Sequence, residues 1–164
     1  MAVSGSGAPG GEQYQEAIGA LYAMAYTVKM SRKKDGLGDY VIGKLEGLYR
    51  FGDKLEEMQW TLLIRTPEVV GQSDLESARA KLQERGKDAG SKKVSLRDHP
   101  PKRYVQALHV GPYDKEQETV EKMAAFAEGE GLEATGEEHH EIYLSDPRRV
   151  APEKLKTILR MAVR

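Results

Sequence analysis

Apolar and polar positions alternate along this chain with two periods, and each period predicts one kind of secondary structure. Apolar side chains that recur every three or four positions are typical of helices with one buried face. This pattern predicts three helices, at 12–30, 75–85 and 114–128. Alternation at every second position predicts strands instead. The predicted strands cover 2–4, 40–51, 58–66, 103–110, 139–145 and 157–163, with a weaker one at 94–96.

Residues typical of turns and helix ends separate these elements. Ser73 and Asp114 are expected to cap the second and third helices, because their short polar side chains accept hydrogen bonds from the free N–H groups of a helix start. Gly129 is expected to end the third helix, and residues 52–53 are expected to form a turn. Pro152 begins a short helical turn before the last strand.

The order of the predicted elements repeats along the chain. A strand, a helix and two further strands occur in about 1–90 and again in about 91–164, and an extra helix follows the first copy. Two such units can join in one antiparallel sheet with helices on one face, which leaves the other face concave. We therefore predict an α+β fold, a single domain over 1–164 built from two pseudo-symmetric β-α-β-β units. Its concave face would hold a ligand pocket at the seam of the two units.

The composition excludes several classes of protein. The 164 residues include 25 Lys and Arg and 26 Asp and Glu, so the net charge of −1 argues against a nucleic-acid-binding protein. The absence of cysteine excludes disulfide bonds, thiolate metal sites and a cysteine nucleophile. No apolar run of about 18 residues and no signal peptide is evident. We therefore expect a cytoplasmic protein that contacts neither a membrane nor nucleic acid directly.

The aromatic residues are mostly tyrosines. The chain has eight Tyr and one Trp but only two Phe. Tyrosine combines an apolar ring with a polar hydroxyl, which suits a pocket wall that faces both an apolar guest and water. The alternative is that these tyrosines occupy half-buried strands, where tyrosine is also frequent.

Established catalytic sequence motifs are absent, and one short segment carries metal-ligand residue types. His139 and His140 precede Glu141, but successive side chains of a strand point to opposite faces. No other candidate ligand is clustered nearby in the sequence. We therefore expect neither a bound metal nor a cofactor.

Glu141 is the candidate catalytic residue. It shares one face of its predicted strand with Tyr143, whereas Ile142 and Leu144 form the apolar set and are expected to face the helices. A carboxylate beside aromatic rings in a cleft binds cations or transfers protons, because a low dielectric strengthens both roles. The alternative is a solvated glutamate on an edge strand.

Several apolar residues are candidates for contact with a ligand. Trp60 and Leu62 share a strand face, so they either form core or line a pocket. Tyr49 and Phe51 share the face of another strand and would join such a lining. Tyr113 follows Gly-Pro and either leans over the pocket mouth or packs against its own turn. With Tyr143, these are the candidate substrate-binding residues.

Three segments of the second half resemble the GyrI-like small-molecule-binding domains, which are related to effector-binding domains of multidrug-responsive transcription regulators. The segments are 106–114, 139–149 and 152–160, and shorter segments at 14–17, 45–49 and 59–61 also fit. The resemblance implies the twice-repeated β-α-β-β fold. It also implies that Glu141, with Tyr143 beside it, lies in the pocket and attracts lipophilic cationic guests.

A subset of stand-alone members, the cyclopropanoid cyclopropyl hydrolases, is similar at further positions. Trp60 and Tyr49 match aromatic positions of that subset, while Arg50 stands where a second aromatic residue is expected. The resemblance implies that the protein binds lipophilic polycyclic compounds and hydrolyses the cyclopropane of DNA-alkylating agents without a cofactor. Glu141 would orient or activate the water, and the result would be detoxification.

Two other functions stay open at this point. One is a non-catalytic multidrug-binding protein that sequesters lipophilic cationic compounds. The other is a protein-interaction module, because some relatives are named for inhibiting DNA gyrase; that partner cannot be inferred from the fold alone.

Overall fold

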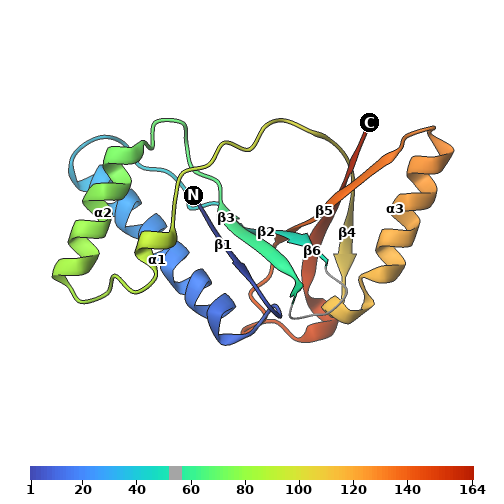
Figure 1. Ribbon diagram of the computed structural model, residues 1–164, viewed down its shortest axis with the longest axis horizontal. Coiled ribbons are helices and arrows are strands. Elements are labelled where there is room, and N and C mark those ends of the chain that lie inside the picture. The colour runs from blue at the N-terminus through green and yellow to red at the C-terminus, as the bar shows by residue number, and fades with distance from the viewer. Residues whose placement is uncertain (52–56) are drawn as a thin grey trace. The chain divides into compact units, whose positions relative to one another are not determined.

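The computed structural model describes residues 1–51 and 57–164, so the turn expected at 52–53 lies outside the described residues. Three helices and six strands occur in the described part of the chain (Figure 1). In chain order they are β1 (Ala2–Ser6), α1 (Glu12–Lys34), β2 (Leu45–Arg50), β3 (Gln59–Ile64), α2 (Gln72–Glu84), β4 (Arg103–Val110), α3 (Gln117–Gly129), β5 (Ala134–Tyr143) and β6 (Lys156–Val163). The fold is therefore α+β, and the predicted order of elements is confirmed.

The chain forms two compact units. Unit 1 consists of Met1–Lys44 and Phe51–Asp98, and unit 2 consists of Leu45–Arg50 and His99–Arg164. The strand β2 is part of unit 2, where it pairs with β5.

In unit 1, two helices and a strand pair form the core. Strands β1 and β3 are antiparallel, with Val3 opposite Leu62, and α1 packs against both strands and against α2 (Figure 1). Most of the apolar stripe of α1 that the sequence predicts is buried, from Tyr14 to Val28, whereas Ile18 and Tyr22 are half-buried. Arg32 of α1 and Asp74 of α2 form an ion pair at 3.0 Å, which joins the two helices.

In unit 2, four antiparallel strands lie in the order β2-β5-β6-β4. Helix α3 packs against β4 and β6, beside them in Figure 1. The core between helix and sheet consists of Val105, Met123, Ala127, Leu159 and Val163. This core defines the helix side of the unit 2 sheet.

Both predicted helix caps are wrong. The N-cap of α2 is Gly71, whose N–H donates to the side chain of Asp74 at 2.9 Å, so the acidic side chain of the first turn does the capping in place of Ser73. Asp114 lies within a 3₁₀ turn, Tyr113–Lys115, because the extended Pro112 delays the α-helix until Gln117.

Other element boundaries also differ from the prediction. Only 45–50 of the predicted strand 40–51 pairs with a neighbour, whereas β5 begins five residues earlier than predicted, at Ala134. The weak strand at 94–96 is reduced to one bridge, between Ala2 and Ser95. The short helical turn at Pro152–Lys154 is confirmed. In the described residues, no helix is both long and apolar enough to cross a bilayer.

Candidate functional site

The helix side of the unit 2 sheet carries Glu141. Directly opposed residues of an antiparallel pair point to the same face, and Glu141 lies opposite Leu159, which packs beneath α3. The prediction that Ile142 faces the helices is therefore wrong, and Glu141 and Tyr143 are the residues on that side, while Leu144 follows the end of β5. Apolar alternation misassigned the face because the apolar Ile142 is buried on the face away from α3.

Glu116 reaches this face from the N-cap position of α3. It is only 9% exposed, and its Oε1 has no hydrogen-bond partner. Burial, and to a smaller extent the negative charge of Glu141, raise the pKa of the Glu116 carboxyl to about 8. The turn before α3 explains the placement: Gly111 has a φ of 145°, which favours glycine, and the 3₁₀ turn that follows puts Tyr113 and Glu116 one turn apart.

Three polar groups of this face come together. His139 Nε2 lies 3.2 Å from Glu141 Oε1. One carboxylate oxygen each of Glu116 and Glu141 and one ring nitrogen of His139 all lie within 4.8 Å of one another. These residue types bind divalent metals and also transfer protons. As predicted, His140 does not join the group, since it points to the opposite face. The sequence did not indicate Glu116, because one glutamate in a polar turn carries no periodic signal.

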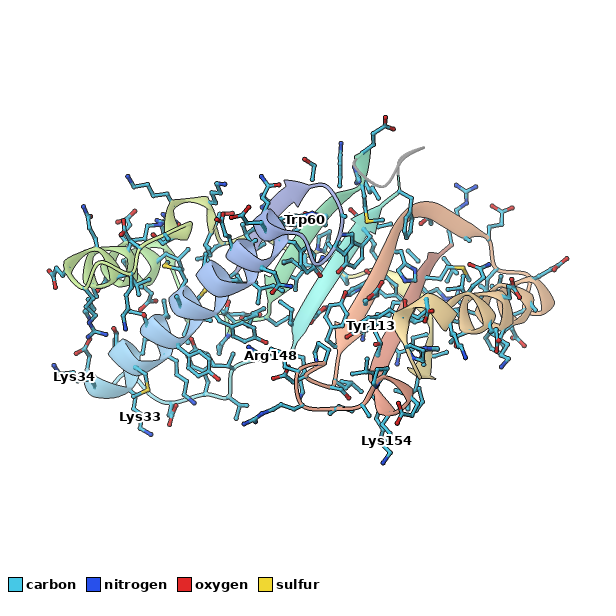
Figure 2. All side chains as sticks on the ribbon, turned by 90° about the horizontal axis from the view of Figure 1, so that it is seen from below. Lys33, Lys34, Trp60, Tyr113, Arg148 and Lys154 are labelled. Carbon is cyan, nitrogen blue, oxygen red and sulfur yellow. The ribbon has the colours of Figure 1, made fainter. Side chains whose placement is uncertain are left out.

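Three tyrosines lie beside this polar group, and we call them the tyrosine trio: Tyr49, Tyr113 and Tyr143. The hydroxyls of Tyr49 and Tyr143 are hydrogen-bonded. The ring of Tyr113 meets that of Tyr143 edge-on, with centroids 6.0 Å apart. Figure 2 shows Tyr113 next to β5. The trio thus provides aromatic surface on the face of the unit 2 sheet that carries Glu141.

The ring of Tyr49 rests on Gly47, two residues earlier in β2. A Cβ at Gly47 would lie 2.5 Å from the Tyr49 hydroxyl oxygen. Gly47→Ala should therefore displace the ring, break its contact with Tyr143 and lower the free energy of unfolding by about 1–3 kcal/mol. Urea denaturation measures the loss, and near-ultraviolet circular dichroism reports the tyrosine environment.

Gly19 offers the matched control for this substitution. It lies within α1, and an added Cβ there has no neighbour within 4 Å. Gly19→Ala should leave stability unchanged or raise it by up to about 1 kcal/mol, because alanine favours the helix. If Gly47→Ala were equally harmless, Tyr49 would not depend on the glycine for its position.

The other candidate contacts lie in unit 1. Trp60 and Leu62 of β3 are fully buried there, and Trp60 meets Tyr14 edge-on at 5.2 Å. A cavity of about 30 Å³ beside Trp60 has room for one or two water molecules, not for an aromatic guest. Phe51, directly after β2, is 69% exposed. The structure thus gathers Glu141, Tyr49, Tyr113 and Tyr143 in unit 2.

A second polar pair lies on the opposite face of the unit 2 sheet. His140 Nε2 donates a hydrogen bond to Glu46 Oε2 at 2.7 Å, and both side chains are buried. The rings of His99 and Tyr104 pack edge-on against His140, with centroids 5.7 and 5.8 Å away. Because this pair is closed off from solvent, it holds the sheet together and does not belong to the candidate site.

Comparisons with known proteins agree with the fold and with the presence of a ligand site. The model of the GyrI-like small molecule binding domain matches residues 1–164. An uncharacterized conserved protein from Listeria innocua is 40% identical, with a TM-score of 0.93, over 99% of this chain and 86% of that chain. A protein described as a hydrolase from Listeria innocua is also 40% identical, with a TM-score of 0.90, over 99% and 85%.

A more distant structure shares only the fold. The C-terminal domain of EcmrR is 12% identical, with a TM-score of 0.59, over 99% of this chain and 89% of that domain. No curated protein matches the chain.

Proposed function

Because the chain belongs to the GyrI-like small-molecule-binding family, we propose that it binds lipophilic aromatic compounds and hydrolyses those that carry an activated cyclopropane. The observation that carries the proposal is the position of Glu141 beside the tyrosine trio and a second carboxyl. A relative at 40% identity is described as a hydrolase, which favours an enzyme over a passive binder.

The tyrosine trio would bind a flat polycyclic guest. Tyrosine rings offer offset and edge-on contacts to such a guest, and the hydrogen bond between the Tyr49 and Tyr143 hydroxyls fixes two of the rings. The pseudo-symmetric pairing of the two β-α-β-β copies and a concave pocket are part of this proposal, whereas the buried Trp60 and Leu62 act in it as core residues of unit 1.

Glu141 would orient or deprotonate the attacking water. When a cyclopropane is conjugated to a dienone, its opening converts the dienone into an aromatic phenol, so an aromatic site that favours the flat product-like state lowers the barrier. His139, 3.2 Å from Glu141, would hold the carboxylate in position. Hydrolysis before such a compound reaches DNA would protect the cell.

The test is incubation of the protein with a cyclopropane-bearing DNA alkylator, followed by mass spectrometry. We expect the compound to gain one water, and Glu141→Gln to lower the rate by about 10²–10⁴-fold, as for loss of a general base. Glu138→Gln is the matched control, because Glu138 lies on the same strand but pairs with Arg50 at 3.1 Å. Equal rates for wild type and Glu141→Gln would exclude this role.

A carboxyl next to three tyrosines also favours a second function, the sequestration of lipophilic cations. That function predicts that a cationic dye binds more weakly to Glu141→Gln and that the cyclopropane compound elutes with the protein unchanged. The product analysis therefore separates the two functions.

A further inference from the structure

We infer that Glu116 is the proton donor of this site, working as a pair with Glu141, which acts on the water. We call Glu116 and Glu141 the carboxyl pair. The inference rests on the proposed hydrolysis and adds to it a second catalytic residue, on a different element.

The geometry gives the two carboxyls different roles. Glu141 has His139 at 3.2 Å, a partner that stabilises its charge. Glu116 is buried, and its Oε1 lacks a hydrogen-bond partner. Two carboxylates this close in a low dielectric cannot both ionise readily, so the proton belongs on Glu116. Carboxyls in contrasting environments divide acid and base roles in this way.

We do not assign the role of proton donor to the other titratable groups around Glu116. From β5 it faces His139 and Glu141, Tyr143 lies on the same face of that strand, and its own turn carries Tyr113, Asp114 and Lys115. On β4, His109 uses both ring nitrogens elsewhere: Nε2 donates to the Pro112 carbonyl at 3.1 Å, and Nδ1 accepts from Thr119 Oγ1 at 3.0 Å. The pKa of Glu116, raised to about 8 first by burial and then by Glu141, agrees with a proton held at neutral pH.

The pair completes a balanced reaction. The oxygen of water forms a bond to a cyclopropane carbon while the carbon–carbon bond to the dienone ring breaks. The released electron pair makes the ring aromatic and places charge on the former carbonyl oxygen. Glu116 gives its proton to that oxygen, and Glu141 takes a proton from the water. Transfer of a proton from Glu141 back to Glu116 resets the site, and the net change is the addition of one water.

A first experiment needs no substrate. Carbon-13 NMR of protein labelled in glutamate side chains should show one carboxyl that titrates near pH 8 and is missing in Glu116→Gln. Glu141→Gln should move that titration to lower pH, because it removes the negative neighbour, and Glu138→Gln should not move it. If Glu116 titrates near its ordinary 4.5, the inference is wrong.

A second experiment follows turnover. Glu116→Gln should slow hydrolysis by about 10²–10⁴-fold, and the decline in wild-type activity as the pH rises through about 8 should disappear. The loss should shrink for substrates whose product phenol is more acidic, since these need less help from a donor. Glu116→Asp keeps a titrating carboxyl and should retain the alkaline decline.

The contrary outcomes are distinguishable. An equal slowing of all substrates by Glu116→Gln, with an unchanged pH profile, would give Glu116 only a structural role and overturn the inference alone. No turnover by the wild type would overturn the proposed hydrolysis together with it. Activity that is lost to a chelator and restored by Zn²⁺, with zinc binding that requires Glu116, would place a metal where we place the proton.

Discussion

Replacing His140 with alanine is expected to lower the free energy of unfolding by about 3–5 kcal/mol. His140 is 1% exposed, and its Nε2 donates to Glu46 Oε2 at 2.7 Å. The substitution deprives the buried Glu46 carboxyl of this donor and leaves a cavity beside the rings of His99 and Tyr104. Urea denaturation followed by circular dichroism measures the change.

A surface ion pair provides the control for this prediction. Glu133 and Arg164 pair at 2.8 Å with side chains 71% and 75% exposed, so Glu133→Gln should change the free energy of unfolding by no more than about 0.5 kcal/mol. The double variant Glu46→Met, His140→Leu removes both polar partners and should be more stable than His140→Ala. If the double variant is less stable than His140→Ala, the loss of stability comes from packing around the imidazole and not from the hydrogen bond.

Trp60→Ala should have a similar effect on unit 1, again about 3–5 kcal/mol. The indole is 2% exposed and packs on Tyr14. It also packs on Gly5, where an added Cβ would collide with the ring. Trp60→Phe should cost much less, because it keeps a ring and removes an indole N–H that has no hydrogen-bond partner. Thermal and urea unfolding of both variants test this order.

A control substitution in α3 makes a functional test of Trp60 interpretable. Phe126 of α3 is exposed, and Phe126→Ala should leave stability within about 0.5 kcal/mol of wild type. If Trp60→Ala were as stable as Phe126→Ala yet failed to bind the cyclopropane compound, Trp60 would be a ligand contact and not a core residue. Loss of turnover in an unstable Trp60→Ala protein would not assign the residue to the site.

The sequence predicted those parts of the fold in which one local signal dominates. The strand 103–110 was predicted with its observed ends because a regular alternation runs between Pro101 and Gly111. Helix α1 extends to Lys34, beyond the predicted end, because its last turn is held by backbone bonds and by Arg32 pairing with Asp74. Such a contact between distant residues leaves no mark in a local pattern.

The candidate site was predictable only in part, for the same reason. Strand alternation predicts that Glu141 and Tyr143 share a face, and the strand register confirms this prediction. Which face carries the helix could not be decided from burial in the sequence pattern, because the buried residues described in β5, His140 and Ile142, lie on the face away from α3, whereas Glu141 and Tyr143 are half-buried. Glu116 joins Glu141 across 25 positions of sequence, through the turn before α3, and only the three-dimensional arrangement brings them together.

The assignment of β2 to unit 2 has a consequence for any attempt to divide this protein. Because the chain enters unit 2 for six residues, returns to unit 1 and then enters unit 2 again, no single cleavage yields both units intact. A fragment starting at residue 99 would lack Tyr49 and would present the unpaired edge of β5 as a template for another strand. The two halves of the sequence are thus not independent folding modules, and fragments of this chain would be prone to self-association through the strand that carries Glu141.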